Sequence, residues 1–275
     1  MRDAAKAKQD TSELTRLREV GWCRFAADAD LIRWIHDSRA TIDQSIRDPE
    51  NAHWLRYDDT WFAGVNVLPN DDRGAVPNGP PLSGRAISFI HERLGHRTLP
   101  WDRAQVSVCY PGYPRPVNEE SDAVFAFRRD RDAAHIDGLL KDGPDRRRYL
   151  REHHAFILGI PVSTHDDGAA PFTVWEGSHR LIGGWLRDRL RDIPTCDWGK
   201  CDLTEEYTAI RREAFRSCRR VPIPAQPGEA YLVHRHALHG MAPWADGAAS
   251  DSGGRIIVYF RPPMNNLEAW LSASD

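Results

Sequence analysis

The chain has 275 residues, of which 41% are hydrophobic, enough for one large domain with a substantial core. Its net charge of -3 comes from 37 basic and 40 acidic residues, and this balance gives no long-range attraction to nucleic acid or to a membrane surface. The longest apolar stretch, residues 155–162, is too short to cross a bilayer, and the polar N-terminus lacks a signal-peptide pattern, so we expect a soluble, cytoplasmic protein.

The first hundred residues are predicted to be mostly helical. Three helices are expected there: a short one opened by Thr11–Leu14 that stops near Gly21, one capped by Asp28, and one over Ser83–Leu94. Residues 54–68 alternate enough to form a strand, and the breaker-rich segment 70–81 predicts a loop.

After Pro100 the pattern changes to short β-like runs separated by turns. Seven strands are predicted, over residues 105–110, 123–128, 154–162, 172–175, 218–223, 229–234 and 255–261. Two helices, Leu181–Arg191 and Thr204–Phe215, interrupt them. Short strands with Gly and Pro turns favour an antiparallel barrel or jelly roll. We therefore expect a mainly β chain with flanking helices (α+β), one domain with a helical elaboration over 1–100 and a jelly-roll core over 101–265.

The five cysteines form an odd set without regular spacing, which favours free thiols in a reducing compartment. Cys196 and Cys201 are the nearest pair, but no second pair follows them, so a zinc site there is not favoured.

His135-Ile136-Asp137 is the most informative motif. Residues i and i+2 of an extended chain point to the same face, so His135 and Asp137 can bind one metal ion together. On its own the pattern is weak, because a chain with 12 histidines contains such pairs by chance.

A second group of histidines strengthens the metal hypothesis. Residues 227–234 are predicted to form a turn followed by a strand, and residues 235–238 a tight turn that reverses the chain. If the chain turns there, His239 is the third ligand; if it stays extended, His234 or His236 is the candidate. The remaining histidines would then pack in the core or form hydrogen bonds to a ligand.

Two histidines and one carboxylate suit a non-haem Fe(II) centre, which leaves positions open for a cosubstrate and O₂. Arg255 precedes the apolar run 256–260, and a buried arginine at that point needs an anion, for which its planar fork matches a carboxylate. An exposed edge arginine is the alternative interpretation, and Arg261 is the alternative carboxylate-binding residue.

Together these segments resemble the phytanoyl-CoA dioxygenase-like family of Fe(II)- and 2-oxoglutarate-dependent oxygenases. The matching segments follow in the family's order: Leu17–Phe25, Tyr110–Pro114, His135–Gly138, Glu176–Arg180, Pro227–Gly240 and Arg255. The resemblance implies a double-stranded β-helix (jelly-roll) core in which His135, Asp137 and His239 bind iron. It also implies that Arg255 grips the far carboxylate of 2-oxoglutarate and that the turn at 176–180 is a framework feature.

The chain departs from the family pattern at two places. Met241 stands where relatives often carry a small hydroxyl residue that helps to hold 2-oxoglutarate, and the loop 242–254 is longer than usual. Gln105 lies on the early strand where relatives place amide side chains toward the cosubstrate or substrate, so it is a further candidate.

The reaction implied by the resemblance is hydroxylation of a small-molecule C–H bond, with 2-oxoglutarate and O₂ converted to succinate and CO₂. Related halogenases lack the metal carboxylate, so Asp137 favours hydroxylation.

Basic runs lie on either side of the metal motif and would suit an anionic substrate, although such runs are more often solvated. They consist of Arg128, Arg129, Arg131, Arg146–Arg148 and Arg151. The rival functions are a cupin-like metal dioxygenase that does not use 2-oxoglutarate and a non-catalytic jelly-roll binding module.

Overall fold

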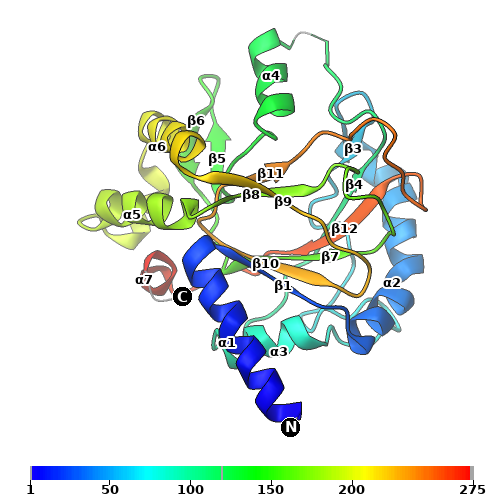
Figure 1. Ribbon diagram of the computed structural model, residues 1–275. Coiled ribbons are helices and arrows are strands. Elements are labelled where there is room, and N and C mark those ends of the chain that lie inside the picture. Colours follow the sequence, from blue (N-terminus) through cyan, green and yellow to red (C-terminus); the bar gives the residue numbers. More distant parts are fainter. Residues whose placement is uncertain (1, 119, 273–275) are drawn as a thin grey trace.

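Two antiparallel sheets form the centre of the computed structural model, which describes residues 2–118 and 120–272 (Figure 1). The large sheet has the order β1 (Trp22–Phe25), β10 (Ala230–His234), β7 (Phe156–Pro161), β12 (Arg255–Phe260), β4 (Gln105–Cys109), β3 (Trp61–Phe62) and β2 (Leu55–Arg56). The small sheet has the order β11 (His239–Met241), β8 (Phe172–Glu176) and β9 (Arg219–Ile223). A separate hairpin pairs β5 (Leu139–Asp142) with β6 (Arg147–Leu150).

Helices surround these sheets. They are α1 (Arg2–Val20), α2 (Ala29–Arg47), α3 (Arg85–Glu92), α4 (Asp122–Asp130), α5 (Ser178–Leu190), α6 (Thr204–Ser217) and α7 (Leu267–Leu271), with 3₁₀ helices η1 (Pro49–Trp54) and η2 (Thr195–Lys200). Within the described residues, none of these helices is both long enough and apolar enough to cross a membrane.

Alternate side chains of β12 point to opposite faces of the large sheet and belong to two different cores. Ile256, Val258 and Phe260 lie in the core shared with α2 and α3. Ile257 and Tyr259 lie in the core between the two sheets. The large sheet is therefore covered by helices on one face and by the small sheet on the other. Because alternate residues of a strand share a face, Arg255 is placed on the side of Ile257 and Tyr259.

A third core holds α5, α6 and α7 together with the β5–β6 hairpin. Trp175 of β8 belongs to it, as do Leu139 and Leu150, which are partners across the hairpin. These helices lie together at one end of the small sheet, next to the hairpin (Figure 1).

Most predicted elements are present. The structure confirms the strands expected near 105, 156, 172, 219, 230 and 255, and the helices expected near 85, 181 and 204. The predicted cap of α2 is also confirmed, since the Asp28 carboxylate accepts hydrogen bonds from the backbone N–H groups of Asp30 and Leu31, both at 3.0 Å.

Two predicted strands were wrong. Residues 123–128 lie in helix α4, whose first turn is capped by the Ser121 hydroxyl accepting from Val124 N–H. A short apolar run fits either structure, and the cap decides for the helix. Residues 54–68 form only the two short strands β2 and β3, because residues 57–59 adopt left-handed backbone conformations and turn the chain.

Other differences concern the extent of helix and strand. Helix α1 begins at Arg2 rather than at Thr11, and β1, which pairs with β10, was not predicted. The chain combines helices with antiparallel sheets, as expected. However, helical residues outnumber strand residues in the described part, so "mainly β" was wrong.

Candidate metal centre

His135 and His239 face each other across a two-residue antiparallel bridge. The backbone N–H of His135 donates to the carbonyl of His239 at 2.8 Å, and the reverse bond is 3.0 Å. Strand β10 ends at His234 and β11 begins at His239, so the turn predicted at 235–238 is confirmed. This turn brings His239 to the His135 motif and leaves His234 on a different strand.

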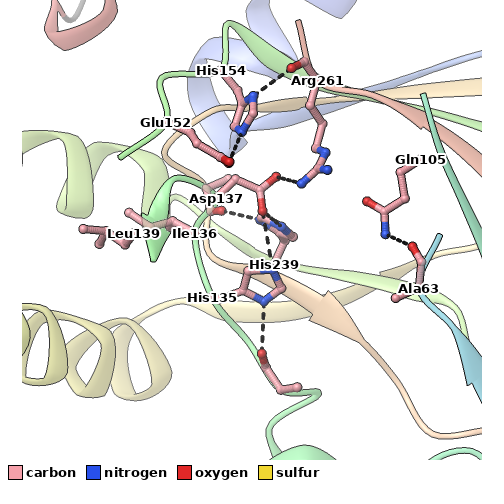
Figure 2. A network of polar contacts seen from close by, with 12 residues as sticks. Ala63, Gln105, His135, Ile136, Asp137, Leu139, Glu152, His154, His239 and Arg261 are labelled. Atoms are coloured by element: carbon pink, nitrogen blue, oxygen red, sulfur yellow. Dashed lines mark hydrogen bonds and ion pairs between the residues drawn. The ribbon is translucent and has the colours of Figure 1, made fainter. Parts of the chain in front are cut away.

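Three potential ligand atoms converge on one point. Asp137 Oδ1 lies 3.5 Å from His135 Nε2 and 3.6 Å from His239 Nε2, and the ligand atoms of the three residues all lie within 4.8 Å of one another (Figure 2). Among the described residues, this is the only such group of three or more His, Cys, Asp or Glu side chains. Cys196 and Cys201 do not belong to a group of this kind.

Both histidines are held in the tautomer that a metal needs. His135 Nδ1 lies 3.1 Å from the carbonyl oxygen of Ala133, and His239 Nδ1 lies 3.0 Å from that of Ala237. A carbonyl only accepts hydrogen bonds, so each Nδ1 carries a proton and Nε2 is the atom of each ring that is available to a metal. The His239 ring is also stacked on Phe172, with ring centroids 5.3 Å apart. Both Nε2 atoms therefore face Asp137.

The second carboxylate oxygen of Asp137, Oδ2, faces Arg261 rather than the two histidines. Arg261 Nη1 lies 3.5 Å from Asp137 Oδ2, and the Arg261 carbonyl accepts a 2.7 Å hydrogen bond from His154 Nδ1. Nε2 of His154 in turn lies 3.0 Å from Glu152 (Figure 2). Burial on its own raises the pKa of Asp137, but Arg261 and His239 outweigh burial and lower this pKa well below 3.8, so the carboxyl group is ionised. Neither Glu152 nor His154 was predicted, because no recognised motif marks them.

Two glycines allow the chain to approach the ligands closely. A Cβ atom at Gly240 would lie 2.2 Å from the carbonyl oxygen of Asp132, and one at Gly138, which has φ +84°, would lie 2.1 Å from that of Glu152. Any side chain at either position would push the backbone away from its neighbour. The glycines that follow His239 and Asp137 are therefore required by packing.

Two hydroxyl groups fix the backbone beside the ligands. Ser178 Oγ accepts a 2.8 Å hydrogen bond from the N–H of Leu238, and the Tyr207 hydroxyl accepts one of 3.1 Å from Ile136 N–H. Gly177 occupies the N-cap position of α5, and the Ser178 hydroxyl binds the turn before His239 rather than capping the helix. The 176–180 segment thus supports the metal centre from outside.

His234 and His236 lie away from the centre. The His234 ring packs against His179 at 5.0 Å between centroids, and the His236 ring packs against Trp270 at 4.5 Å. Burial lowers the pKa of both histidines well below 6.5, so they are neutral core residues.

Arg255 is completely buried and has no acidic partner in the part of the chain that the structure describes. Its side chain is at the start of β12, opposite Cys109 of β4. Nη2 contacts Cys109 Sγ at 3.3 Å and Met241 Sδ at 2.8 Å, while Nε and Nη1 have no hydrogen-bond partner among the described residues. Of the two interpretations that the sequence left open for Arg255, the structure shows the buried one, and sulfur atoms compensate its charge poorly.

Two cavities meet at the three-residue cluster. The inner cavity, of about 300 Å³, lies between the sheets and is lined by aromatic side chains together with Gln105 and Met241. Gln105 is held at this wall by donating to the carbonyl of Ala63 at 2.7 Å (Figure 2). The outer cavity, of about 830 Å³, opens toward α4, α6 and the β5–β6 hairpin. Both cavities are lined by His135, Asp137 and Arg261.

Comparison with known proteins gives matches only among solved structures. No protein-family model matches the chain. No curated protein sequence matches it either. The α-ketoglutarate-dependent carbocyclase SnoK of nogalamycin biosynthesis is similar, with 16% identity over 91% of this chain and 83% of that chain and a TM-score of 0.49.

Two further solved structures are HygX from Streptomyces hygroscopicus and EctD from S. alaskensis. HygX, solved with nickel, 2-oxoglutarate and hygromycin B bound, has 11% identity over 93% of this chain and 87% of that chain and a TM-score of 0.47. EctD, solved with bound Fe, has 15% identity over 93% of this chain and 76% of that chain and a TM-score of 0.43. Because these TM-scores lie below 0.5, the function of the chain is argued from its own residues.

Proposed function

We propose that the chain is a non-haem Fe(II)- and 2-oxoglutarate-dependent oxygenase that hydroxylates a C–H bond of a small molecule. We also propose that the two facing sheets form the jelly-roll core of a single domain. The observation that carries the functional proposal is the convergence of His135 Nε2, His239 Nε2 and Asp137 Oδ1 at the meeting point of two cavities.

The donor set fits ferrous iron. Two imidazole nitrogens and one carboxylate oxygen on one side of a metal leave its other positions open, which is the arrangement that non-haem Fe(II) oxygenases use. The carbonyl contacts of both Nδ1 atoms supply the outer hydrogen bonds that metal-binding histidines require. A non-catalytic binding module would have no need of this preorganisation.

Arg255 supports 2-oxoglutarate as the cosubstrate. A buried cation without an anion is costly, and a carboxylate bound to the Nη1 and Nη2 edge of the guanidinium would satisfy Nη1 and replace the sulfur contacts of Nη2. Met241, which lines the inner cavity, contacts the guanidinium, so its flexible thioether must turn aside when the carboxylate binds. A metal dioxygenase that does not use 2-oxoglutarate would have no use for a buried arginine here.

When bound, iron, 2-oxoglutarate and O₂ supply the oxidising chemistry, in which the oxo acid becomes succinate and CO₂ while a substrate C–H bond is hydroxylated. The protein positions and encloses these groups. Asp137 supplies negative charge toward the metal, and Arg261 fixes the orientation of its carboxylate. The aromatic wall of the inner cavity, formed by Tyr57, Trp61, Tyr113 and Phe172, limits the access of water.

Succinate formation tests this function without knowledge of the substrate. The protein would be incubated aerobically with Fe(II), 2-oxoglutarate and ascorbate, and slow uncoupled conversion to succinate would be measured, with ascorbate supplying the two electrons that a substrate would otherwise give. We expect the wild-type protein to form succinate, Asp137→Ala to lose this activity by orders of magnitude, and the exposed-site control His36→Ala to keep it. Equal rates in the wild type and Asp137→Ala would refute the proposal.

A further inference from the structure

The outer cavity has two chemically different walls beside the metal centre. Its basic wall consists of Lys141 and Arg146 from the β5–β6 hairpin, Arg148 from β6 and Arg211 from α6. Its apolar wall consists of Val124 and Phe127 from α4 and Leu140 from β5. Strand β5 begins two residues after Asp137, so the hairpin that carries much of both walls is joined directly to the metal motif.

The four cations of the basic wall have no carboxylate partner within the described residues. Arg148 donates to the backbone carbonyl of Leu139 at 2.9 Å and lies over the ring of Tyr207. Arg211 lies over Phe127 and Tyr207, at 4.7 and 5.3 Å from the ring centroids. These contacts orient the guanidinium groups without neutralising them.

The nearby carboxylates are engaged elsewhere. Asp142 accepts from Arg151 at 2.8 Å, and Arg147 Nε lies 2.5 Å from Asp202. Glu152, which lines the same cavity, contacts His154. The cations of the basic wall are thus left unneutralised while their neighbours are paired.

Strand register makes this arrangement costly in the absence of a ligand. Lys141 is the direct cross-strand partner of Arg148, and like charges in such positions repel. Burial, together with Arg148, Arg146 and Arg211, lowers the pKa of Lys141, as expected for a cation held among other cations. A bound anion would remove this repulsion.

The apolar wall is exposed to an unusual degree. Val124 and Leu140 are 53% and 43% exposed and are among the few large hydrophobic residues in the described chain that remain exposed. Both lie on this cavity with Phe127. Apolar side chains gathered at the mouth of a cavity mark a binding surface rather than a solvated face.

We propose that the outer cavity binds an amphiphilic anion, with a phosphate-type head group on the basic wall and an apolar body along the apolar wall. This molecule is the substrate, a step that rests on the function proposed above. Guanidinium and ammonium groups donate charge-assisted hydrogen bonds to phosphate oxygens. The apolar body then extends beside His135 and Asp137, which line the same cavity.

Calorimetric titration with octyl phosphate, below its micellar concentration and without iron or 2-oxoglutarate, tests the binding site. We expect octyl phosphate to bind about tenfold or more tightly than octanol or inorganic phosphate, because only it meets both walls. Lys141→Gln/Arg146→Gln should weaken its binding by about tenfold or more. Leu140→Asn should weaken binding of octyl phosphate and leave inorganic phosphate unchanged.

Arg147→Gln is the matched control. Arg147 lies on β6 next to Arg148 but is paired with Asp202 and Glu205 rather than placed on the outer cavity, so octyl phosphate should bind this variant like the wild type. Equal binding by the double variant and the control, or equal binding of octyl phosphate and octanol, would overturn the proposed site.

Adding octyl phosphate to the anaerobic Fe(II)–2-oxoglutarate protein separates the site from the proposed function. A shift in the visible absorption band of the iron chelate supports the substrate role, and binding that leaves this band unchanged overturns it. Octyl phosphate binding by a protein that forms no iron chelate would refute the oxygenase function while the anion site stands.

Discussion

Arg255 and Arg261 lie at opposite ends of the β12 segment, and their guanidinium groups contact different side chains. Arg261 lines both cavities with Nη1 beside the Asp137 carboxylate, whereas Arg255 is fully buried against two sulfur atoms. We therefore expect Arg261 to position a metal ligand and Arg255 to bind the cosubstrate.

Exchanging each arginine for methionine distinguishes these two roles. Removing one partner from a buried charge pair costs about 3–5 kcal/mol, so Arg255→Met should weaken 2-oxoglutarate binding by roughly 100-fold or more and change Fe(II) affinity little. Arg261→Met should weaken Fe(II) binding by about 10–100-fold, the usual effect of losing a group that orients a metal ligand. Equilibrium titrations of both ligands on both variants measure the difference.

The stability of the unliganded Arg255→Met protein is a control for folding. A buried charge without an anion is replaced by an apolar side chain, so the free energy of unfolding should be unchanged or higher. If 2-oxoglutarate binding is lost in Arg261→Met and kept in Arg255→Met, the two assignments must be exchanged.

Met241 is the second residue that we expect to affect cosubstrate binding. Its sulfur lies 2.8 Å from Arg255 Nη2, where it competes with an incoming carboxylate. Met241→Thr removes this competitor and adds a hydroxyl group, and a hydrogen bond contributes about 0.5–1.5 kcal/mol, so the Kd for 2-oxoglutarate should fall by roughly threefold to tenfold. Met241→Leu removes the sulfur but keeps the bulk and adds no hydroxyl group, so the Kd should fall less than in Met241→Thr. Weaker binding by Met241→Thr than by Met241→Leu would contradict this account.

The sequence predicted much of the site at the level of residues. The parity of His135 and Asp137 and the turn before His239 follow from local chain geometry. The choice between Arg255 and Arg261 does not, because it depends on which residues from distant parts of the chain surround each of them. Only the register that places Arg255 beside Cys109 shows which arginine is buried.

At the level of elements, a cluster of three histidines joins α1, α5 and the end of β10. His179 Nε2 lies 3.0 Å from the carbonyl oxygen of Arg18, and the rings of His179, His234 and His236 follow one another at 5.0 and 5.3 Å. Burial lowers the pKa of His179 to about 4 and holds the other two well below 6.5. The junction is thus built from neutral histidines.

This cluster makes stability depend on pH. Between pH 6.5 and about 4 the unfolded chain protonates His179 and the folded chain does not, so the free energy of unfolding falls as the pH is lowered. Each such histidine contributes a slope of about 1.4 kcal/mol per pH unit. His179→Gln should reduce the slope by about this amount in denaturant titrations between pH 6 and 5, and the exposed-site control His36→Gln should not. Parallel slopes in the wild type and His179→Gln would rule out a titrating His179.

Elements were predictable where local signals agreed with tertiary packing. Strand β12 is a continuous apolar run, and it lies in the middle of the large sheet with both faces covered. Helix α4 was misread because a short apolar run fits either a strand or a helix and the Ser121 cap was not recognised. Strand β1 was missed because its four residues become a strand only by pairing with β10.

For the whole molecule, the candidate functional residues gather where the layers meet. The candidate metal motif contacts the small sheet at the His135–His239 bridge, Arg255 comes from the large sheet, and the basic wall comes from a hairpin outside both sheets. The metal motif and Arg255 could be proposed from the sequence because they belong to a set of motifs that follow one another in the order of the family described above. The hairpin could not, because its arginines read as a solvated run until the structure places them beside Asp137.

The most direct test of the oxygenase function is anaerobic titration of the protein with Fe(II) and then with 2-oxoglutarate, followed by visible absorption. Chelation of iron by the oxo acid gives a charge-transfer band, and we predict that the wild-type protein develops this band with one equivalent of each ligand. Asp137→Ala should not bind Fe(II) and should show no band, and Arg255→Met should require a much higher 2-oxoglutarate concentration to develop it. A wild-type protein that binds Fe(II) but develops no band at saturating 2-oxoglutarate would contradict the proposed function.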